Sequence, residues 1–275
     1  MKYKKYEEKA QQLREEMFEM TVKAKTGHLT SSLSCVEILT TLFYGGIMRY
    51  NSQNPDWAGR DYFIMSKAQA SPIYYEILAD VGYFPKEDLK LFAQAEGKMG
   101  VHLQDSVPGC EITAGSLGCG YGIAAGIALA LKKNRENNMV FSLLGDGECY
   151  EGAIWETALF TAHNRLNNLI TIVDRNFICA THFLEDELGM EPIEDKWKAF
   201  GFEVNRIDGH SFEQLFGVLE NVRSKRNTKP IVIIADTVKG KGIPFIADQP
   251  LWHGITVTKE EDVVTARKEL TSNRR

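Results

Sequence analysis

Apolar and polar positions along the chain follow two different periods. In residues 3–25, apolar side chains recur every three or four positions among charges, which predicts a helix with Met17 and Met20 in the core, stopping at Gly27. Short runs rich in β-branched residues predict buried strands at 62–65, 139–144, 169–173, 203–207 and 231–235. Further helices are predicted at 34–43, 72–80, 118–131, 153–164, 212–224 and 259–275, with another closing at 197–200.

The alternation of these strands and helices predicts the fold class. Near-continuous apolar strands separated by helices are typical of a parallel sheet that is covered on both faces. We therefore predict an α/β fold with three layers, α/β/α, around a mostly parallel sheet. We expect one domain over residues 1–258 and a charged C-terminal helical tail over residues 259–275.

Composition excludes several classes of function. The chain has 32 Lys and Arg against 37 Asp and Glu, a formal net charge of -5, which argues against a nucleic-acid partner. No apolar stretch approaches the roughly 20 residues that a membrane span requires, and no signal peptide is visible. Five cysteines without a CxxC pair argue against a disulfide framework or a zinc site, and they fit a reducing cytoplasm.

The strongest chemical signal follows the predicted strand 139–144. Gly145, Asp146 and Gly147 come directly after this strand and before a helix. Ligands of parallel sheets bind at the carboxyl ends of strands, near helix N-termini that offer free N–H groups. Glycines let the backbone approach a phosphate, but Asp146 would repel it unless a metal ion bridges the two. Mg²⁺ suits this bridge because it takes few protein ligands.

A second metal ligand is expected at the end of the neighbouring strand. Asn176 follows Asp146 by about the length of one helix and one strand, so the chain returns to the same edge of the sheet. Gly-Asp-Gly alone is also compatible with a simple strand-to-helix turn. The paired Asn176 favours a metal–phosphate site over that alternative.

Asp146 and Asn176, with their glycines, resemble the thiamine diphosphate motif, and the flanking segments resemble the N-terminal half of transketolase. The likeness covers roughly residues 10 to 255. The segments that carry it are 145–148 with 151–152, 155–156 and 166–170; 26–28 with 31–32; 108–109 with 113–118; and 237–242 with 252–254.

This resemblance implies a role for each matching residue. Asp146, Asn176 and the Ile178 carbonyl would hold Mg²⁺, with Ca²⁺ or Mn²⁺ as substitutes. The other cofactor-binding residues that it implies are Gln69, Gly115, Ser116, Leu117, Gly147, Glu148, Lys239 and His253. The catalytic candidates are His28 and His102, which match histidines of the substrate channel, and Glu151 and Glu156, which match a carboxylate network at the subunit interface.

Some of these residues also have a structural alternative. Glu151 and Glu156 lie near a predicted helix start, where carboxylates favour the helix dipole. Lys239 by itself is more often a solvated charge, and a lone histidine is more often a surface or core residue than a functional one. Cys149, although it is close to the metal motif, is expected to pack in the core.

The resemblance also implies a missing half. Full-length transketolase is more than twice as long and includes a pyrimidine-binding domain, which supplies an essential Glu, and a C-terminal domain. This chain would therefore be the N-terminal subunit of a split transketolase, expected as an α₂β₂ complex and inactive without a separate C-terminal subunit. The complex would transfer a two-carbon ketol unit from a ketose or ketose phosphate to an aldehyde, with sugars or sugar phosphates as substrates.

Two departures from the family pattern keep other functions open. Gln69 replaces a histidine near the diphosphate, so an acid–base role there is lost. Residues 177–182 replace the Ile-x-Gly that tends to follow the Asn in the family. One alternative is half of another thiamine-diphosphate enzyme, a carboligase or decarboxylating enzyme with a 2-oxoacid donor that would release CO₂. Another is a catalytically silent binding partner. An NAD-type Rossmann enzyme is disfavoured because no GxGxxG motif opens a helix after a strand.

Overall fold

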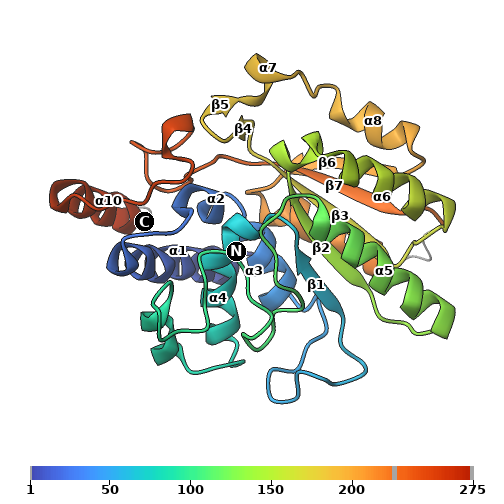
Figure 1. The fold of residues 1–275 in the computed structure, drawn as a ribbon, viewed down its shortest axis with the longest axis horizontal. Helices are drawn as coiled ribbons and strands as arrows, with labels where there is room; N and C mark the ends of the chain where they lie inside the picture. Colours follow the sequence, from blue (N-terminus) through green and yellow to red (C-terminus); the bar gives the residue numbers. More distant parts are fainter. Residues whose placement is uncertain (1, 225–227, 273–275) are drawn as a thin grey trace.

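A parallel β-sheet forms the centre of the protein (Figure 1). The computed structural model describes residues 2–224 and 228–272, so residues 273–275 of the predicted tail lie outside the described residues. The sheet has five strands in the order β1-β2-β3-β7-β6, and all neighbours pair in parallel. The strands are β1 (Tyr62–Met65), β2 (Val140–Gly145), β3 (Leu169–Arg175), β6 (Glu203–Asp208) and β7 (Ile231–Asp236). The predicted parallel sheet is confirmed, with strand ends within two residues.

Alternate residues of each strand enter two separate cores. In β2, Phe141 and Leu143 pack in one core, whereas Val140 and Leu144 pack in the other. Because successive side chains of a strand point to opposite faces, burial on both faces requires apolar residues at every position. This requirement explains the near-continuous apolar runs and confirms the three-layer architecture.

Two sets of helices cover the two faces. The first core includes residues of α1 (Lys4–Ala24), α3 (Val36–Tyr44), α4 (Ser71–Asp80) and α9 (Phe212–Ser224). The second includes residues of α5 (Cys119–Asn134), α6 (Gly152–His163) and α8 (Ile193–Ala199). Figure 1 shows α5 and α6 side by side, with α1, α3 and α4 on the other side of the sheet.

The charged helix near the C-terminus is α10 (Glu260–Ser272), which packs on α1. Val263, Ala266 and Leu270 are buried and join the same core as α1. The three apolar residues follow the spacing of one helix face, while the charged residues of α10 face outward. The domain boundary at residue 258 stays a prediction.

Short elements account for most differences from the predicted pattern. They are α2 (Leu29–Leu33), the antiparallel pair β4 (Ile178–Cys179) and β5 (His182–Phe183), α7 (Leu184–Glu187), and 3₁₀ turns at Ala68–Ala70, Lys86–Leu91, Gly147–Tyr150 and Pro250–Trp252. Elements of two to six residues are too short to show a period in the sequence. The predicted stop at Gly27 comes slightly late, because the left-handed Lys25 (φ 55°) already ends α1 at Ala24.

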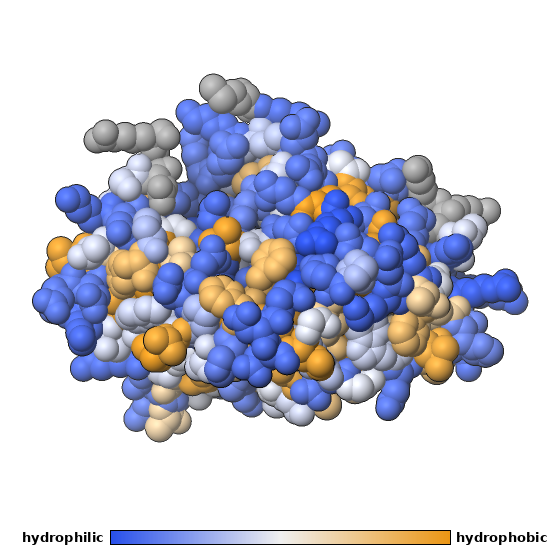
Figure 2. Space-filling model, turned by 90° about the horizontal axis from the view of Figure 1, so that it is seen from above, coloured by the Kyte–Doolittle hydropathy of each residue, from blue (hydrophilic) through white to orange (hydrophobic). Residues whose placement is uncertain are grey.

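The surface in Figure 2 is mostly hydrophilic, with separate apolar groups. Exposed large apolar side chains include Ile123 on α5 and Leu159 and Phe160 on α6. No helix within the described ranges is long and apolar enough to cross a membrane.

The central strand gives a test of the fold. Ile172 of β3 is 1% exposed and lies between Leu143 and Ile233 in the sheet register. Ile172→Ala is expected to lower the free energy of unfolding by about 3 kcal/mol, because it leaves a cavity. Urea unfolding measures this loss. The matched control Ile123→Ala, at a position 42% exposed, should change stability by less than about 0.5 kcal/mol. Equal losses in the two variants would contradict the assignment of β3 to the centre of the core.

Candidate functional site

A cavity of about 130 Å³ lies at the carboxyl ends of β2 and β3. It gathers residues from distant parts of the chain, including most of the predicted cofactor ligands. Its lining residues are Ser31, Lys67, Gln69, Leu117, Gly145, Asp146, Gly147, Glu148, Asn176, Ile178, Cys179, Ala180, Lys239 and His253. The predicted convergence of the two strand ends is therefore present in the structure.

Asp146 connects these two strand ends. Its Oδ1 accepts a hydrogen bond from the Gly147 N–H at 2.8 Å, and its Oδ2 accepts one from the Phe177 N–H at 2.6 Å. The Arg175 guanidinium lies 3.2 Å from the same Oδ2. Burial raises the pKa of Asp146, and the charge of Asp174 adds to this, while Arg175 and Lys239 oppose it. A further cation in the cavity would favour the ionised carboxylate.

Asn176 and Ile178 supply neutral oxygens beside Asp146. The Asn176 Oδ1 accepts a hydrogen bond from the Ile178 N–H at 3.3 Å, and the Ile178 carbonyl accepts one from Lys239 Nζ at 3.0 Å. A cationic group thus already contacts the carbonyl that the sequence assigned to a metal. Carboxylate, amide and carbonyl oxygens are the ligand types that suit Mg²⁺. Within the described ranges, no group of three or more His, Cys, Asp or Glu side chains could hold a metal.

Gly147 allows the backbone to approach closely here. A Cβ atom at this position would lie 2.8 Å from the Cys179 sulfur, so any larger residue would push the two loops apart. The close contact leaves the Gly147 turn against the loop after β3. This geometry fits the predicted role of a glycine turn at a phosphate.

A buried ion pair lies next to the cavity. Lys67 donates to Asp174, whose carboxylate also accepts hydrogen bonds from Ser34 Oγ at 2.6 Å and from Thr237 Oγ1. Burial would raise the pKa of Asp174, but Lys67 outweighs it and lowers that pKa. Neither residue was assigned from the sequence, although a carboxylate inside the apolar run of β3 is a signal for a buried partner.

Glu148 organises the loops around the site. Its buried carboxylate accepts hydrogen bonds from the Gly118 N–H at 2.9 Å and the Gly145 N–H at 3.0 Å, and from Ser66. Burial raises the pKa of this carboxyl group. Glu148 lines the cavity as predicted, and its hydrogen bonds join the start of α5 to the glycine turn.

Three histidines gather beside the cavity. The His28 ring lies 5.3 Å from that of His102 and 5.6 Å from that of His253, measured between centroids. His253 Nδ1 is 2.9 Å from Lys239 Nζ. His28 Nδ1 is buried without a hydrogen-bond partner among the described residues, so it remains available to a ligand.

The charge state of this cluster follows from its burial. Burial, with the charges of His102 and Lys239, lowers the pKa of His28 to about 4. Burial, with Lys239 and His28, lowers the pKa of His253 to about 3. Burial also lowers the pKa of Lys239 to about 8. At neutral pH, His28 and His253 are therefore neutral and can accept hydrogen bonds or protons.

The structure places four predicted residues outside the cavity lining. Gly115 lies next to His102, and Ser116 is exposed. Glu151 and Glu156 are exposed at the start of α6. Their predicted role at a subunit interface stays a prediction. Cys149 is fully buried, which confirms its expected packing role.

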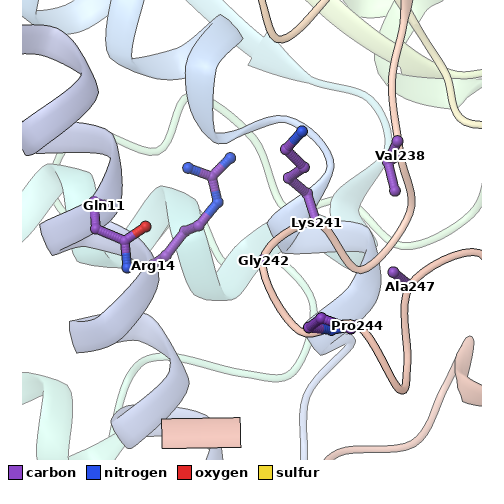
Figure 3. Close-up of a pocket in the computed structure, with 7 residues that line it drawn as sticks. All are labelled: Gln11, Arg14, Val238, Lys241, Gly242, Pro244 and Ala247. Atoms are coloured by element: carbon purple, nitrogen blue, oxygen red, sulfur yellow. The ribbon is translucent and has the colours of Figure 1, made fainter. Parts of the chain in front are cut away.

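A larger pocket of about 630 Å³ lies elsewhere, between α1 and the loop that follows β7. Figure 3 shows Gln11 and Arg14 of α1 facing Lys241 of this loop. None of the residues predicted for the site lines this pocket. The smaller cavity, which gathers them, is therefore the candidate functional site.

The parallel sheet and the oxygen ligands at its carboxyl edge define an α/β domain of the kind that binds a phosphorylated cofactor. The family is shown by comparison with known proteins. Residues 6–275 match the family described as "Transketolase, thiamine diphosphate binding domain". The chain belongs to this family.

Related proteins include short chains of similar length. The apulose-4-phosphate transketolase subunit of this kind from Actinobacillus succinogenes is 36% identical over 274 residues, covering 98% of this chain and 97% of that protein. The 6-deoxy-6-sulfo-D-fructose transketolase subunit SqwG from a Clostridium species is also 36% identical, with 86% of each chain covered. The similarity to the N-terminal subunit of a split transketolase is thereby confirmed.

Single-chain transketolases match over only part of their length. Human transketolase is 34% identical over 91% of this chain, which corresponds to 40% of that protein. The crystal structure of transketolase from Campylobacter jejuni superimposes with a TM-score of 0.90 at 32% identity. It covers 97% of this chain, whereas this chain spans 42% of the length of that one.

The lowered histidine pKa values predict a pH dependence of stability. The pKa of His28 falls from 6.5 when unfolded to about 4 when folded, and that of His253 falls from 6.5 to about 3. Below pH 6.5 the unfolded chain binds more protons, so the free energy of unfolding should decrease from pH 7 to pH 5. Urea unfolding at pH 7, 6 and 5 measures this decrease. The double variant His28→Gln/His253→Gln should show a smaller decrease, and an unchanged one would contradict the assignment.

Proposed function

We propose that this chain is the N-terminal subunit of a thiamine-diphosphate- and Mg²⁺-dependent transketolase. The assembled enzyme would transfer a two-carbon ketol unit from a ketose or ketose phosphate to an aldehyde. The observation that carries this proposal is that Asp146, Asn176 and the Ile178 carbonyl meet in one cavity beside Gly147. The family membership of the chain supports the same cofactor.

Each part of the site would have a defined task. Asp146, Asn176 and the Ile178 carbonyl would hold the metal, and the Gly147 N–H would donate to the diphosphate. Thiamine diphosphate supplies an electron sink for the carbanion that C–C cleavage leaves. The neutral His28 and the nearby His102 would accept hydrogen bonds from sugar hydroxyls or move a proton.

The partner would be a separate C-terminal subunit with the pyrimidine-binding domain, in an α₂β₂ complex. Relatives of this length are named as subunits, and single-chain transketolases are more than twice as long. Exposed apolar side chains on α5 and α6, namely Ile123, Leu159 and Phe160, lie on the same two-helix layer as Glu151 and Glu156. An exposed apolar surface of this kind supports the proposed subunit interface.

The substrates would be sugars or sugar phosphates. The two short relatives are named for apulose-4-phosphate and 6-deoxy-6-sulfo-D-fructose, two ketoses that carry an anionic group. Gln69 lines the cavity, where it can donate and accept hydrogen bonds without carrying a proton. A cytoplasmic location accompanies this proposal, and it is supported by the free state of all five cysteines, each of which lies in the described ranges.

Purification from the native cells tests the assembly. The tagged chain would be isolated with thiamine diphosphate and Mg²⁺ present, and the copurifying chains identified by mass spectrometry. A stoichiometric partner with a pyrimidine-binding domain, and ketol transfer by the complex, would support the proposal. Release of CO₂ from a 2-oxoacid would favour a decarboxylating enzyme instead. A chain without such a partner would favour the silent binding module.

The metal assignment predicts the effect of removing Asp146. Asp146→Ala should abolish Mg²⁺-dependent binding of thiamine diphosphate to the assembled complex, because the charged member of the proposed ligand set is lost. Calorimetric titration measures the binding, and circular dichroism checks that the fold is intact. Asp195→Ala, at an exposed carboxylate on α8, is the control and should bind normally. Undiminished binding by Asp146→Ala would rule out the metal assignment.

The departure at Gln69 predicts a change in substrate preference. Gln69→His restores the imidazole of the family pattern in the cavity, and thus a group that can carry a proton. The ratio of kcat/KM values for alternative donors and acceptors should therefore change. An unchanged ratio for all substrates tested would show that Gln69 does not determine specificity.

A further inference from the structure

One buried guanidinium joins the candidate metal site to the segment 184–191. Arg175 is fully buried, and its Nη1 lies 3.2 Å from Asp146 Oδ2. Its Nη2 donates to Glu185 Oε1 at 3.0 Å and to Glu191 Oε1 at 2.9 Å. Three carboxylates, one of them a candidate metal ligand, therefore share a single cation. The sequence analysis assigned no role to Arg175, Glu185 or Glu191.

The three carboxylates differ in exposure. The side chain of Asp146 is 1% exposed, whereas those of Glu191 and Glu185 are 31% and 46% exposed. Attraction to the guanidinium is screened least at Asp146 and most at Glu185. The balance among the three pairs therefore depends strongly on the charge around Asp146.

Arg175 and its partners tie the segment to the sheet. Arg175 is the last residue of β3, and its guanidinium stacks 4.1 Å from the centre of the Phe177 ring. Glu191 also accepts from Arg206 of β6 at 3.3 Å, and Arg206 in turn pairs with Asp236 at 2.8 Å. Glu185 is on α7, where Arg175 is the cation it pairs with.

We propose that Arg175 is a positioning residue that couples metal binding at Asp146 to the anchoring of the segment 184–191. This inference rests on the proposed function, since it takes Asp146 as a metal ligand. A divalent cation at Asp146 would share the charge of the carboxylate and repel the guanidinium. The guanidinium would then interact more strongly with Glu185 and Glu191, which holds the segment more firmly beside the site.

Coupling of this kind is reciprocal. Glu185 and Glu191 neutralise Arg175, so they reduce the repulsion that an incoming metal ion meets. Without their charges, Arg175 would compete fully for Asp146 and oppose the metal. Lys239 also faces Asp146 and contributes the same repulsion in every variant. Removing the two glutamate charges should therefore weaken metal binding, although neither carboxylate is a predicted ligand.

The test measures Mg²⁺ binding by the full chain in its complex with the partner subunit, at saturating thiamine diphosphate. Tryptophan fluorescence gives the Mg²⁺ concentration at half saturation. The double variant Glu185→Gln/Glu191→Gln should raise this concentration roughly threefold or more, because an uncompensated charge then acts on the metal site. Both glutamates are partly exposed, so the variant is expected to fold.

A matched control separates this effect from a general loss of negative charge. Glu187 lies in the same segment and is 52% exposed, but it pairs with His182 instead of Arg175. Glu187→Gln should leave half saturation close to that of the wild type. If the double glutamate variant behaves like Glu187→Gln, the coupling is overturned.

Arg175 itself is tested by a variant cycle and by hydrogen exchange. In an Arg175→Met background, the two glutamate substitutions should no longer change half saturation. In the wild type, Mg²⁺ and thiamine diphosphate should slow exchange of the amides in 184–191, and Arg175→Met should abolish this slowing. An effect of the glutamates that persists without Arg175 would overturn the proposal.

The outcomes also separate this inference from the proposed function. A wild-type complex that binds Mg²⁺ and thiamine diphosphate but shows no response in the glutamate variant would overturn only the coupling. A wild-type complex that binds neither would overturn both proposals.

Discussion

The buried ion pair between Lys67 and Asp174 is the interaction on which the site depends. Lys67 follows β1, Asp174 lies near the end of β3, and the carboxylate also accepts from Ser34 and from Thr237 after β7. Four segments are therefore held at one edge of the sheet by a single carboxylate. A pair of this kind stabilises mainly through its geometry, because removal of one partner leaves an uncompensated buried charge that costs about 3–5 kcal/mol.

Around this pair, the cavity combines buried carboxylates with cations that do not fully neutralise them. Asp146 faces Arg175 and Lys239, and it remains a buried acid with a raised pKa. The imidazoles of His28 and His253 are neutral because burial and nearby cations disfavour their charged forms. Such an arrangement is suited to a ligand that brings both a divalent cation and a polyanion, since each would compensate charges that the protein leaves in place.

The organisation of the chain explains how half of a larger enzyme can exist as a separate subunit. The sheet has a core on each face, and α10 extends the core of α1. Burial on both faces supplies the apolar contacts that an independent domain requires. What remains exposed is confined to particular surfaces, including the apolar residues of α5 and α6. The single-chain transketolases carry the same domain within a longer chain.

The sequence by itself determined the layers, the strands and the meeting of Asp146 with Asn176, because burial on both faces leaves a local record in apolar periodicity. It also pointed to Gln69, Glu148 and Lys239, which line the cavity. Only the tertiary structure decided that Lys67 pairs with Asp174, 107 positions away, and that Arg175 bridges Asp146 to the segment 184–191. Such pairs depend on the register of strands and on loops too short to be periodic, so no local pattern encodes them.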